Sequence, residues 1–167
     1  MKVVLCDASP LIILAKLDRL HLIGDLLGKD IVVLQCVVDE VLGERASTLE
    51  RQRLDKFVGT AATVTAFAES DIESKSLSAS DRFTLTYSVR NTVDWLVADE
   101  RLMRRVGSEQ GIAVMGVLGL IVGAAKRRIL TNAEAESALR DAVGLHGLRI
   151  SVILYQRVLD ELQGRID

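Results

Sequence analysis

An apolar run that ends in an aspartate and leads directly into a helix stands near the start of this chain. The run covers residues 3–6 and is followed by Asp7, with Ser9 and Pro10 close behind it. Aliphatic and β-branched residues predict a buried strand. Ser9 as N-cap and Pro10 as the first helical residue predict a helix start. Asp7 is therefore expected at the carboxyl end of a strand, where open α/β sheets bind their ligands.

The same pattern occurs a second time at residues 93–100, where an apolar run precedes Asp99. Two further carboxylates, Glu40 and Asp81, are expected in the first turns of helices. Each of these two also has a structural explanation, because an acidic side chain stabilises a helix start through the dipole or a capping box. Strand ends and the starts of the following helices share one rim of a parallel sheet, so these side chains can converge there.

Strand and helix patterns alternate along the chain up to residue 125. Besides the runs that precede the two aspartates, strands are expected at residues 31–34, 64–66 and 112–115. A helix is expected from Pro10 to a stop at Gly28. The alternation predicts an α/β fold in which helices cover both faces of a parallel sheet.

From residue 131 onward the pattern is helical without intervening strands. Thr131 and Glu134 indicate a capped helix start, and the last helix is expected over residues 148–162. The whole chain of 167 residues is of a length that fits one domain. We therefore expect an α/β domain at residues 1–130 and a helical C-terminal extension, residues 131–167, that packs on the same domain.

The charge balance restricts the ways in which this chain can bind nucleic acid. Its formal net charge is -2, and 4% of its residues are aromatic. Domains that hold nucleic acid by bulk positive charge are strongly basic, and base-stacking platforms need aromatic rings. A phosphate-bearing substrate would therefore need a local basic patch or a bound metal cation. Arg101 and Arg104, on the helix expected after Asp99, are our candidate substrate contacts.

Carboxylates that share one pocket need a counter-charge. Close negative charges raise the pKa of one another's carboxyl groups, so some would stay protonated unless a cation binds. Mg²⁺ and Mn²⁺ are hard ions that prefer carboxylate and water oxygens. Such an ion can activate a water, bind a phosphate oxygen and screen a negatively charged substrate. Mg²⁺ or Mn²⁺ is therefore the expected cofactor.

The segments that carry these carboxylates resemble the motifs of the PIN-domain family of metal-dependent ribonucleases. The similarity is to VapC-type toxins and to a related subgroup of short bacterial and archaeal PIN proteins. The matching segments, in the order of the family, are residues 7–12, 37–41, 79–81 and 96–100. The resemblance implies a three-layer α/β/α sandwich with a central parallel sheet. It also implies an endoribonuclease that cleaves single-stranded RNA with Mg²⁺ or Mn²⁺.

Carried over residue by residue, the resemblance implies a catalytic quartet. Its members are Asp7, Glu40, Asp81 and Asp99, of which Asp7, Asp81 and Asp99 would be metal ligands. Ser9 would contact the substrate side of the site and orient a metal-bound water. Many members of the subgroup carry a Gly-Glu pair near the third acidic position, so Glu73 is an alternative to Asp81 there. Gln35 and Cys36 stand where the subgroup commonly has a proline.

The resemblance also implies partners. Family members often act as toxins held by a small antitoxin protein, and they often form homodimers. No basic and apolar signal region precedes the first strand, and the apolar runs are too short to cross a bilayer. We therefore expect a cytoplasmic protein without a membrane partner. Its two cysteines, Cys6 and Cys36, are expected to be reduced.

Two other functions fit parts of the pattern. A catalytically silent PIN-like module would use the helices over residues 134–162 to bind a protein partner. A haloacid-dehalogenase-like phosphatase would need a second aspartate two residues after the first, and that position holds Ser9. The chain has no glycine-rich loop ending in Lys-Ser or Lys-Thr, which argues against nucleotide hydrolysis of the P-loop type.

Overall fold

The computed structural model describes residues 2–65 and 72–165 of the chain. Within them, five parallel strands form one sheet in the order β3-β2-β1-β4-β5. The strands are β1 (Val3–Cys6), β2 (Asp30–Leu34), β3 (Ala62–Val64), β4 (Trp95–Val97) and β5 (Ala113–Met115). Because β1 lies in the centre and pairs with β4, the strand ahead of Asp7 and the strand ahead of Asp99 are direct neighbours.

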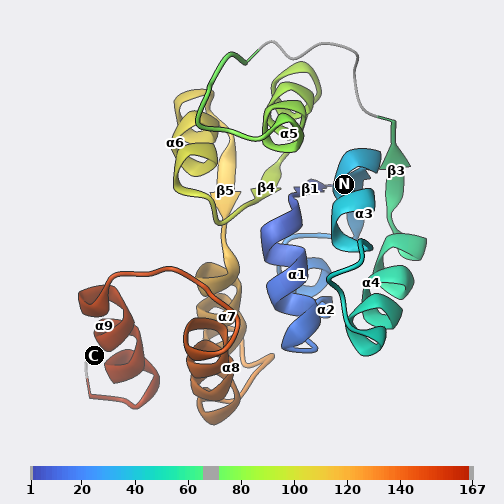
Figure 1. Cartoon of the computed structure of the whole chain (residues 1–167). Helices are drawn as coiled ribbons and strands as arrows, with labels where there is room; N and C mark the ends of the chain where they lie inside the picture. Colours follow the sequence, from blue (N-terminus) through green and yellow to red (C-terminus); the bar gives the residue numbers. More distant parts are fainter. Residues whose placement is uncertain (1, 66–71, 166–167) are drawn as a thin grey trace.

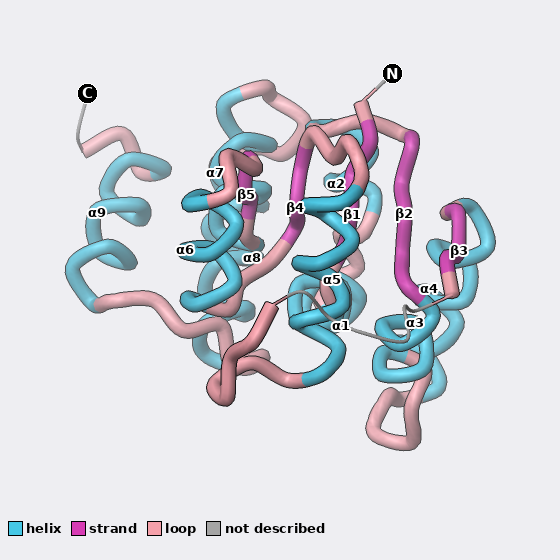
Figure 2. Tube along the Cα trace, turned by 90° about the horizontal axis from the view of Figure 1, so that it is seen from above, coloured by secondary structure: helices cyan, strands magenta, loops and turns pink. Residues whose placement is uncertain are grey.

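Helices cover both faces of this sheet (Figure 1). They are α1 (Ala8–Lys16), α2 (His21–Leu26), α3 (Gln35–Val41), α4 (Thr48–Thr60), α5 (Ala79–Arg90), α6 (Arg101–Glu109), α7 (Val117–Lys126), α8 (Asn132–Gly144) and α9 (Val152–Leu162). α5 and α6 lie side by side on one face, while α1, α2, α3, α4 and α7 lie on the other (Figures 1 and 2). The three-layer α/β/α sandwich with a central parallel sheet is therefore confirmed.

The central strands are apolar along their length because helices cover both of their faces. Val4, Leu5 and Cys6 of β1 are fully buried, as are Leu96 and Val97 of β4. Continuous apolar runs of this kind are typical of strands in parallel sheets. The edge strands β3 and β5 are more exposed. The core therefore holds most firmly the two strands from which the predicted aspartates emerge.

The helices after residue 130 pack beside α7. α8 contacts α7, and α9 contacts both of them (Figure 1). α8 begins with the predicted capping box: the Glu134 carboxylate accepts a hydrogen bond from the Thr131 N–H, and the Thr131 hydroxyl accepts one from the Glu134 N–H. The division into a domain and an extension at residue 130 stays a prediction. Among the described helices, none is long and apolar enough to span a membrane.

The chain after β1 departs from the prediction in two ways. The N-cap of α1 is Asp7 and not Ser9, so the helix begins directly at the strand end. The expected long helix is also divided into α1 and α2, and Asp18 between them has a positive φ of 56°. Arg53 of α4 stabilises this break, because its guanidinium donates to the Ala15 carbonyl oxygen at 2.8 Å and lies 3.2 Å from the Asp18 carboxylate.

Two other element boundaries differ from the prediction. β3 ends at Val64, where the sequence indicates the start of a strand that continues to residue 66, and residue 66 lies outside the described part. The last helix begins at Val152 and not at residue 148, because the Ser151 hydroxyl caps it by accepting a hydrogen bond from the Leu154 N–H. The residues between Gly144, the end of α8, and Val152 therefore form a loop. Cys6 and Cys36 are free thiols, as predicted.

Replacement of Leu5 by alanine is expected to destabilise the protein strongly. Leu5 is fully buried in the central strand, and Leu→Ala in a packed core costs about 2–5 kcal/mol. Leu49→Ala is the matched control, because the Leu49 side chain is 54% exposed and its loss should change stability by less than about 0.5 kcal/mol. Urea unfolding measures both variants. Equal effects on the free energy of unfolding would contradict the central position of β1.

Candidate functional site

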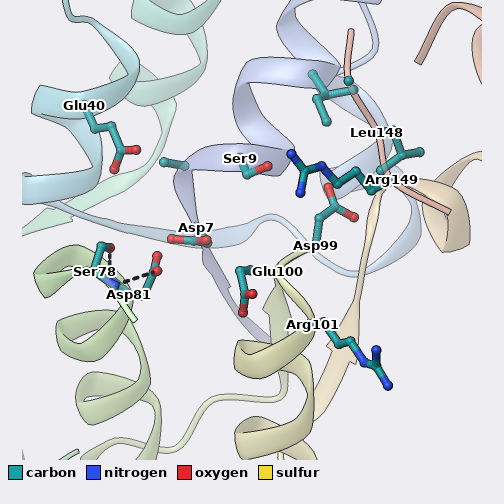
Figure 3. A pocket seen from close by; sticks show the side chains of 13 residues that line it. Asp7, Ser9, Glu40, Ser78, Asp81, Asp99, Glu100, Arg101, Leu148 and Arg149 are labelled. Atoms are coloured by element: carbon teal, nitrogen blue, oxygen red, sulfur yellow. Dashed lines mark hydrogen bonds between the residues drawn. The ribbon is translucent and has the colours of Figure 1, made fainter. Parts of the chain in front are cut away.

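The four predicted carboxylates line one pocket of about 660 Å³ at the carboxyl ends of the central strands (Figure 3). Asp7 follows β1, and Asp99 lies two residues after β4. Glu40 comes from α3 and Asp81 from α5. The Asp7 N–H donates to the Val97 carbonyl oxygen at 3.0 Å, so Asp7 continues the pairing of β1 with β4. Parallel strands end at a common edge, and this brings distant parts of the sequence together.

Asp7 is the most strongly perturbed of these acids. Its side chain is 3% exposed, and its Oδ1 atom has no hydrogen-bond partner within the described structure. Burial raises the pKa of Asp7 to about 7, and the negative charge of Asp81 adds to this rise. Glu40 and Asp99 act in the same direction, whereas the neighbouring Ala8 N–H opposes them because it favours the charged form. A buried carboxyl group among other acids is a frequent mark of a functional site.

Asp99 is held by the start of α7. Its Oδ1 atom accepts a hydrogen bond of 2.9 Å from the Val117 N–H, while its Oδ2 atom is buried and has no partner within the described structure. Burial raises the pKa of Asp99, and the Val117 N–H and the Arg104 guanidinium oppose the rise. Gly116 makes the close approach possible, because a Cβ atom at that position would lie 2.5 Å from Oδ1.

Glu40 lies in the last turn of α3, so its predicted position in the first turn is wrong. The reason is that α3 begins at Gln35, directly after β2, without a separate turn. A carboxylate is unfavourable near the C-terminus of a helix, and the structural explanation for Glu40 therefore does not apply. Partial burial and the charge of Asp81 raise the pKa of Glu40, and the Ser80 side chain opposes the rise. Its position is better explained by the pocket than by the helix.

Asp81 occupies both of the positions that the sequence allows, at the cap of α5 and at the pocket. It forms the predicted capping box with Ser78: its Oδ2 atom accepts a hydrogen bond from the Ser78 N–H, and its own N–H donates to the Ser78 hydroxyl, both at 3.1 Å (Figure 3). At the same time Asp81 lines the pocket, opposite Glu40. Glu73, the alternative third acid, is exposed and is not among the residues that line the pocket.

The predicted substrate contacts are distributed unequally around the pocket. Ser9, in the first turn of α1, and Arg101, at the start of α6, both line it. Figure 3 shows the Arg101 side chain pointing away from the carboxylates. Arg104 is not among the lining residues, and its effect on the site is the opposing charge that it places near Asp99.

Several pocket residues were not predicted as site residues. Glu100 caps α6, where its carboxylate accepts a hydrogen bond of 2.9 Å from the Met103 N–H. Gly147, Leu148 and Arg149 reach the pocket from the loop between α8 and α9. The strand-aspartate-helix pattern includes Glu100, so that signal was available. The loop residues carry no local signal, because their position depends on how the C-terminal helices pack.

The ligand atoms around the pocket are of the chemical type that binds a hard divalent cation. Carboxylate oxygens are the ligands that Mg²⁺ and Mn²⁺ prefer. Asp7 and Asp99 each present a buried oxygen that has no hydrogen-bond partner within the described structure. In the same part of the chain, no three His, Cys, Asp or Glu side chains already lie close enough to hold a metal ion. The residues therefore suit the ion, and the side chains would have to draw together to bind it.

The raised pKa of Asp7 predicts a decrease in stability with rising pH in metal-free buffer. The folded protein keeps a proton on Asp7 up to about pH 7, whereas the unfolded chain releases it near about pH 4. Between these values the folded state binds more protons, so the free energy of unfolding falls as pH rises. The loss approaches about 1.4 kcal/mol for each pH unit of the window.

Asp7→Asn removes this titration and should therefore be more stable than the natural protein above pH 7. The difference should shrink as pH falls and level off below about pH 4, where Asp7 is protonated in both the folded and the unfolded state. Urea unfolding in the presence of EDTA at several pH values measures it. A difference that stays constant with pH would contradict the raised pKa.

Gly116→Ala is expected to displace the Asp99 carboxylate from the Val117 N–H, because the new methyl group would overlap Oδ1. Loss of a hydrogen bond to a charged group costs about 1.5–3 kcal/mol. Gly59→Ala on α4 is the matched control, because nothing lies within 4 Å of its Cβ position. That change should be neutral or stabilise by up to about 1 kcal/mol. Urea unfolding at neutral pH compares them, and an unchanged Gly116→Ala would argue against the contact.

Comparison with known proteins agrees with this geometry. A family model described as a PIN domain matches residues 3–164. A PilT N-terminus domain protein from the hyperthermophilic archaeon Sulfolobus solfataricus P2 has a similar fold, with a TM-score of 0.54 and 11% sequence identity. The similarity covers 71% of this chain and 89% of that protein, and at such low identity it shows the fold alone. No curated protein matches the sequence. The chain belongs to the PIN-domain family.

Proposed function

We propose that this protein is a metal-dependent endoribonuclease that cleaves single-stranded RNA. The observation that carries the proposal is the pair Asp7 and Asp99, which line one pocket with Glu40 and Asp81. Each of the two has a buried oxygen without a hydrogen-bond partner among the residues that the structure describes. PIN domains are generally nucleases, and membership of this family supports phosphodiester cleavage. The choice of single-stranded RNA and of Mg²⁺ or Mn²⁺ rests on the resemblance of the motifs to VapC-type ribonucleases.

The residues of the pocket divide into metal ligands and groups that act on the substrate. Asp7, Asp81 and Asp99 would hold the ion, which supplies positive charge for activating a water and a phosphate oxygen. Glu40 stands across the pocket, and its raised pKa suits it to accept a proton from the attacking water. The Ser9 hydroxyl, in the first turn of α1, would donate a hydrogen bond that orients the water or the phosphate.

The biological role proposed here is that of the toxin in a toxin-antitoxin pair. A small antitoxin protein would be its partner, and a homodimer its proposed oligomeric state. A specific observation is consistent with a protein partner: Val152 and Ile153 on α9 are 83% and 76% exposed. The same surface supports the second candidate function, a catalytically silent PIN-like module that binds proteins.

Cleavage of single-stranded RNA should require Mg²⁺ or Mn²⁺ and should be lost in Asp7→Asn. The substitution keeps the shape of the side chain but removes the buried charge on which cation binding depends. Asp55→Asn on α4 is the matched control, because Asp55 is exposed and lies outside the pocket. Gel analysis of a labelled RNA with and without EDTA measures the activity. If Asp7→Asn cleaved RNA at the rate of the natural protein, the proposal would be wrong.

Thermal unfolding with Mn²⁺ separates the enzyme from the silent module. A ligand that binds only the folded state stabilises it, by about 2.7 kcal/mol at a hundredfold excess over its dissociation constant. The midpoint of the natural protein should therefore rise with millimolar Mn²⁺, and that of Asp7→Asn should not. No rise in either protein would favour the protein-binding module.

A further inference from the structure

The loop between α8 and α9 places an arginine at the acidic pocket. Gly147, with a φ of 76°, adopts the left-handed conformation that favours glycine and lets the chain turn. The next residue, Leu148, is buried, and its N–H donates to the Ala142 carbonyl oxygen at 2.9 Å. On the other side of Arg149, Ser151 caps α9. The backbone is thus anchored on both sides of Arg149, which lines the pocket.

The Arg149 side chain points into the pocket. Figure 3 shows its guanidinium reaching across the opening toward Ser9 and Asp99, whereas Arg101 on the other side points away. Within residues 2–65 and 72–165, Arg149 forms no ion pair or side-chain hydrogen bond. The Arg149 side chain is exposed, so its donors are available to a ligand.

An acidic pocket repels the backbone of RNA unless positive charge offsets the repulsion. The metal ion would act on the phosphate that is cleaved, and each neighbouring phosphate carries its own negative charge. A guanidinium binds a phosphate through two parallel N–H donors, a geometry that a lysine ammonium does not reproduce. Arg149 provides such a fork at the edge of the carboxylate cluster, on a backbone that is already fixed.

We infer that Arg149 binds a backbone phosphate of single-stranded RNA beside the cleaved one and thereby holds the strand over the carboxylates. The inference rests on the proposed function, which it extends to a residue outside the predicted quartet. It also makes the helical extension part of the substrate-binding surface. Arg149 is in this view a substrate-binding residue and takes no part in the proton transfers.

The test measures binding of a short fluorescein-labelled single-stranded RNA of mixed sequence by fluorescence anisotropy. The full-length Asp7→Asn protein is used, so that the RNA stays intact during the titration. In this background Arg149→Ala should weaken binding about tenfold or more, as expected for loss of a charged hydrogen bond. The slope of log affinity against log salt should fall by about 0.7, the value for one phosphate contact on a single strand.

Two further variants separate a specific contact from general charge. Arg149→Lys keeps the charge but loses the fork, so it should bind more weakly while the salt slope is kept. Arg157→Ala on α9 removes another exposed arginine, one that does not line the pocket, and it should leave both the affinity and the salt slope unchanged. In the protein with natural Asp7, Arg149→Ala should raise KM more than it lowers kcat.

Several results would overturn the inference. They are equal RNA affinity of the Asp7→Asn protein with and without Arg149→Ala, an equal loss of affinity in Arg157→Ala, or faster cleavage in Arg149→Ala. Failure of the proposed function is distinguishable from all of these. In that case the natural protein cuts no RNA, while intact RNA still binds in a manner that depends on Arg149.

Discussion

The pairing of β1 with a parallel strand on each side is the constraint on which the site depends. β2 and β4 both bind β1 in register, and all of them end at the same edge of the sheet. The hydrogen bond from Asp7 to Val97 extends this pairing by one residue, beyond the end of the strand. Asp7 is therefore fixed by backbone geometry and not by its own side chain, which makes no capping hydrogen bond to α1. A buried acid held in this way is available to a ligand.

The acids of the pocket destabilise the fold, although the proposed function depends on them. Buried acids that raise the pKa of one another's carboxyl groups destabilise the folded chain at neutral pH. Glu40 adds to the conflict by placing a negative charge at the end of a helix where the dipole disfavours it. Sequences violate local rules of this kind mainly at functional sites, where a ligand removes the conflict. The apolar core around β1 and β4 supplies the stability that the site lacks.

The sequence predicts the sheet and its rim well because these depend on local patterns. A buried strand followed by an aspartate is visible without knowledge of the fold, and both Asp7 and Asp99 lie where that pattern indicates. Helix boundaries were less predictable, since they depend on tertiary contacts. Asp18 breaks the first helix where Arg53 of a distant helix binds it.

Glu40 shows how a small boundary error changes an interpretation. A start at Gln35 moves Glu40 from the first to the last turn of α3 and removes the structural explanation for its charge. Arg149 shows a different limit of prediction from sequence, because here the local pattern carries no signal at all. Nothing in its neighbourhood along the chain indicates a site, because α8 and α9 must first pack beside α7 to bring it there.

The contact between Asp99 and the start of α7 links the pocket to the outer helices. The same carboxylate that faces the pocket also satisfies the Val117 N–H, and α8 and α9 pack on the helix that begins there. A ligand that moved Asp99 would therefore alter the end of α7 as well. Linkage is reciprocal: if a protein bound to the C-terminal helices shifted the start of α7 and thereby Asp99, a ligand in the pocket would change the affinity for that protein by the same factor as the protein changes the affinity for the ligand. Any such coupling would pass through the hydrogen bond between Asp99 and the Val117 N–H.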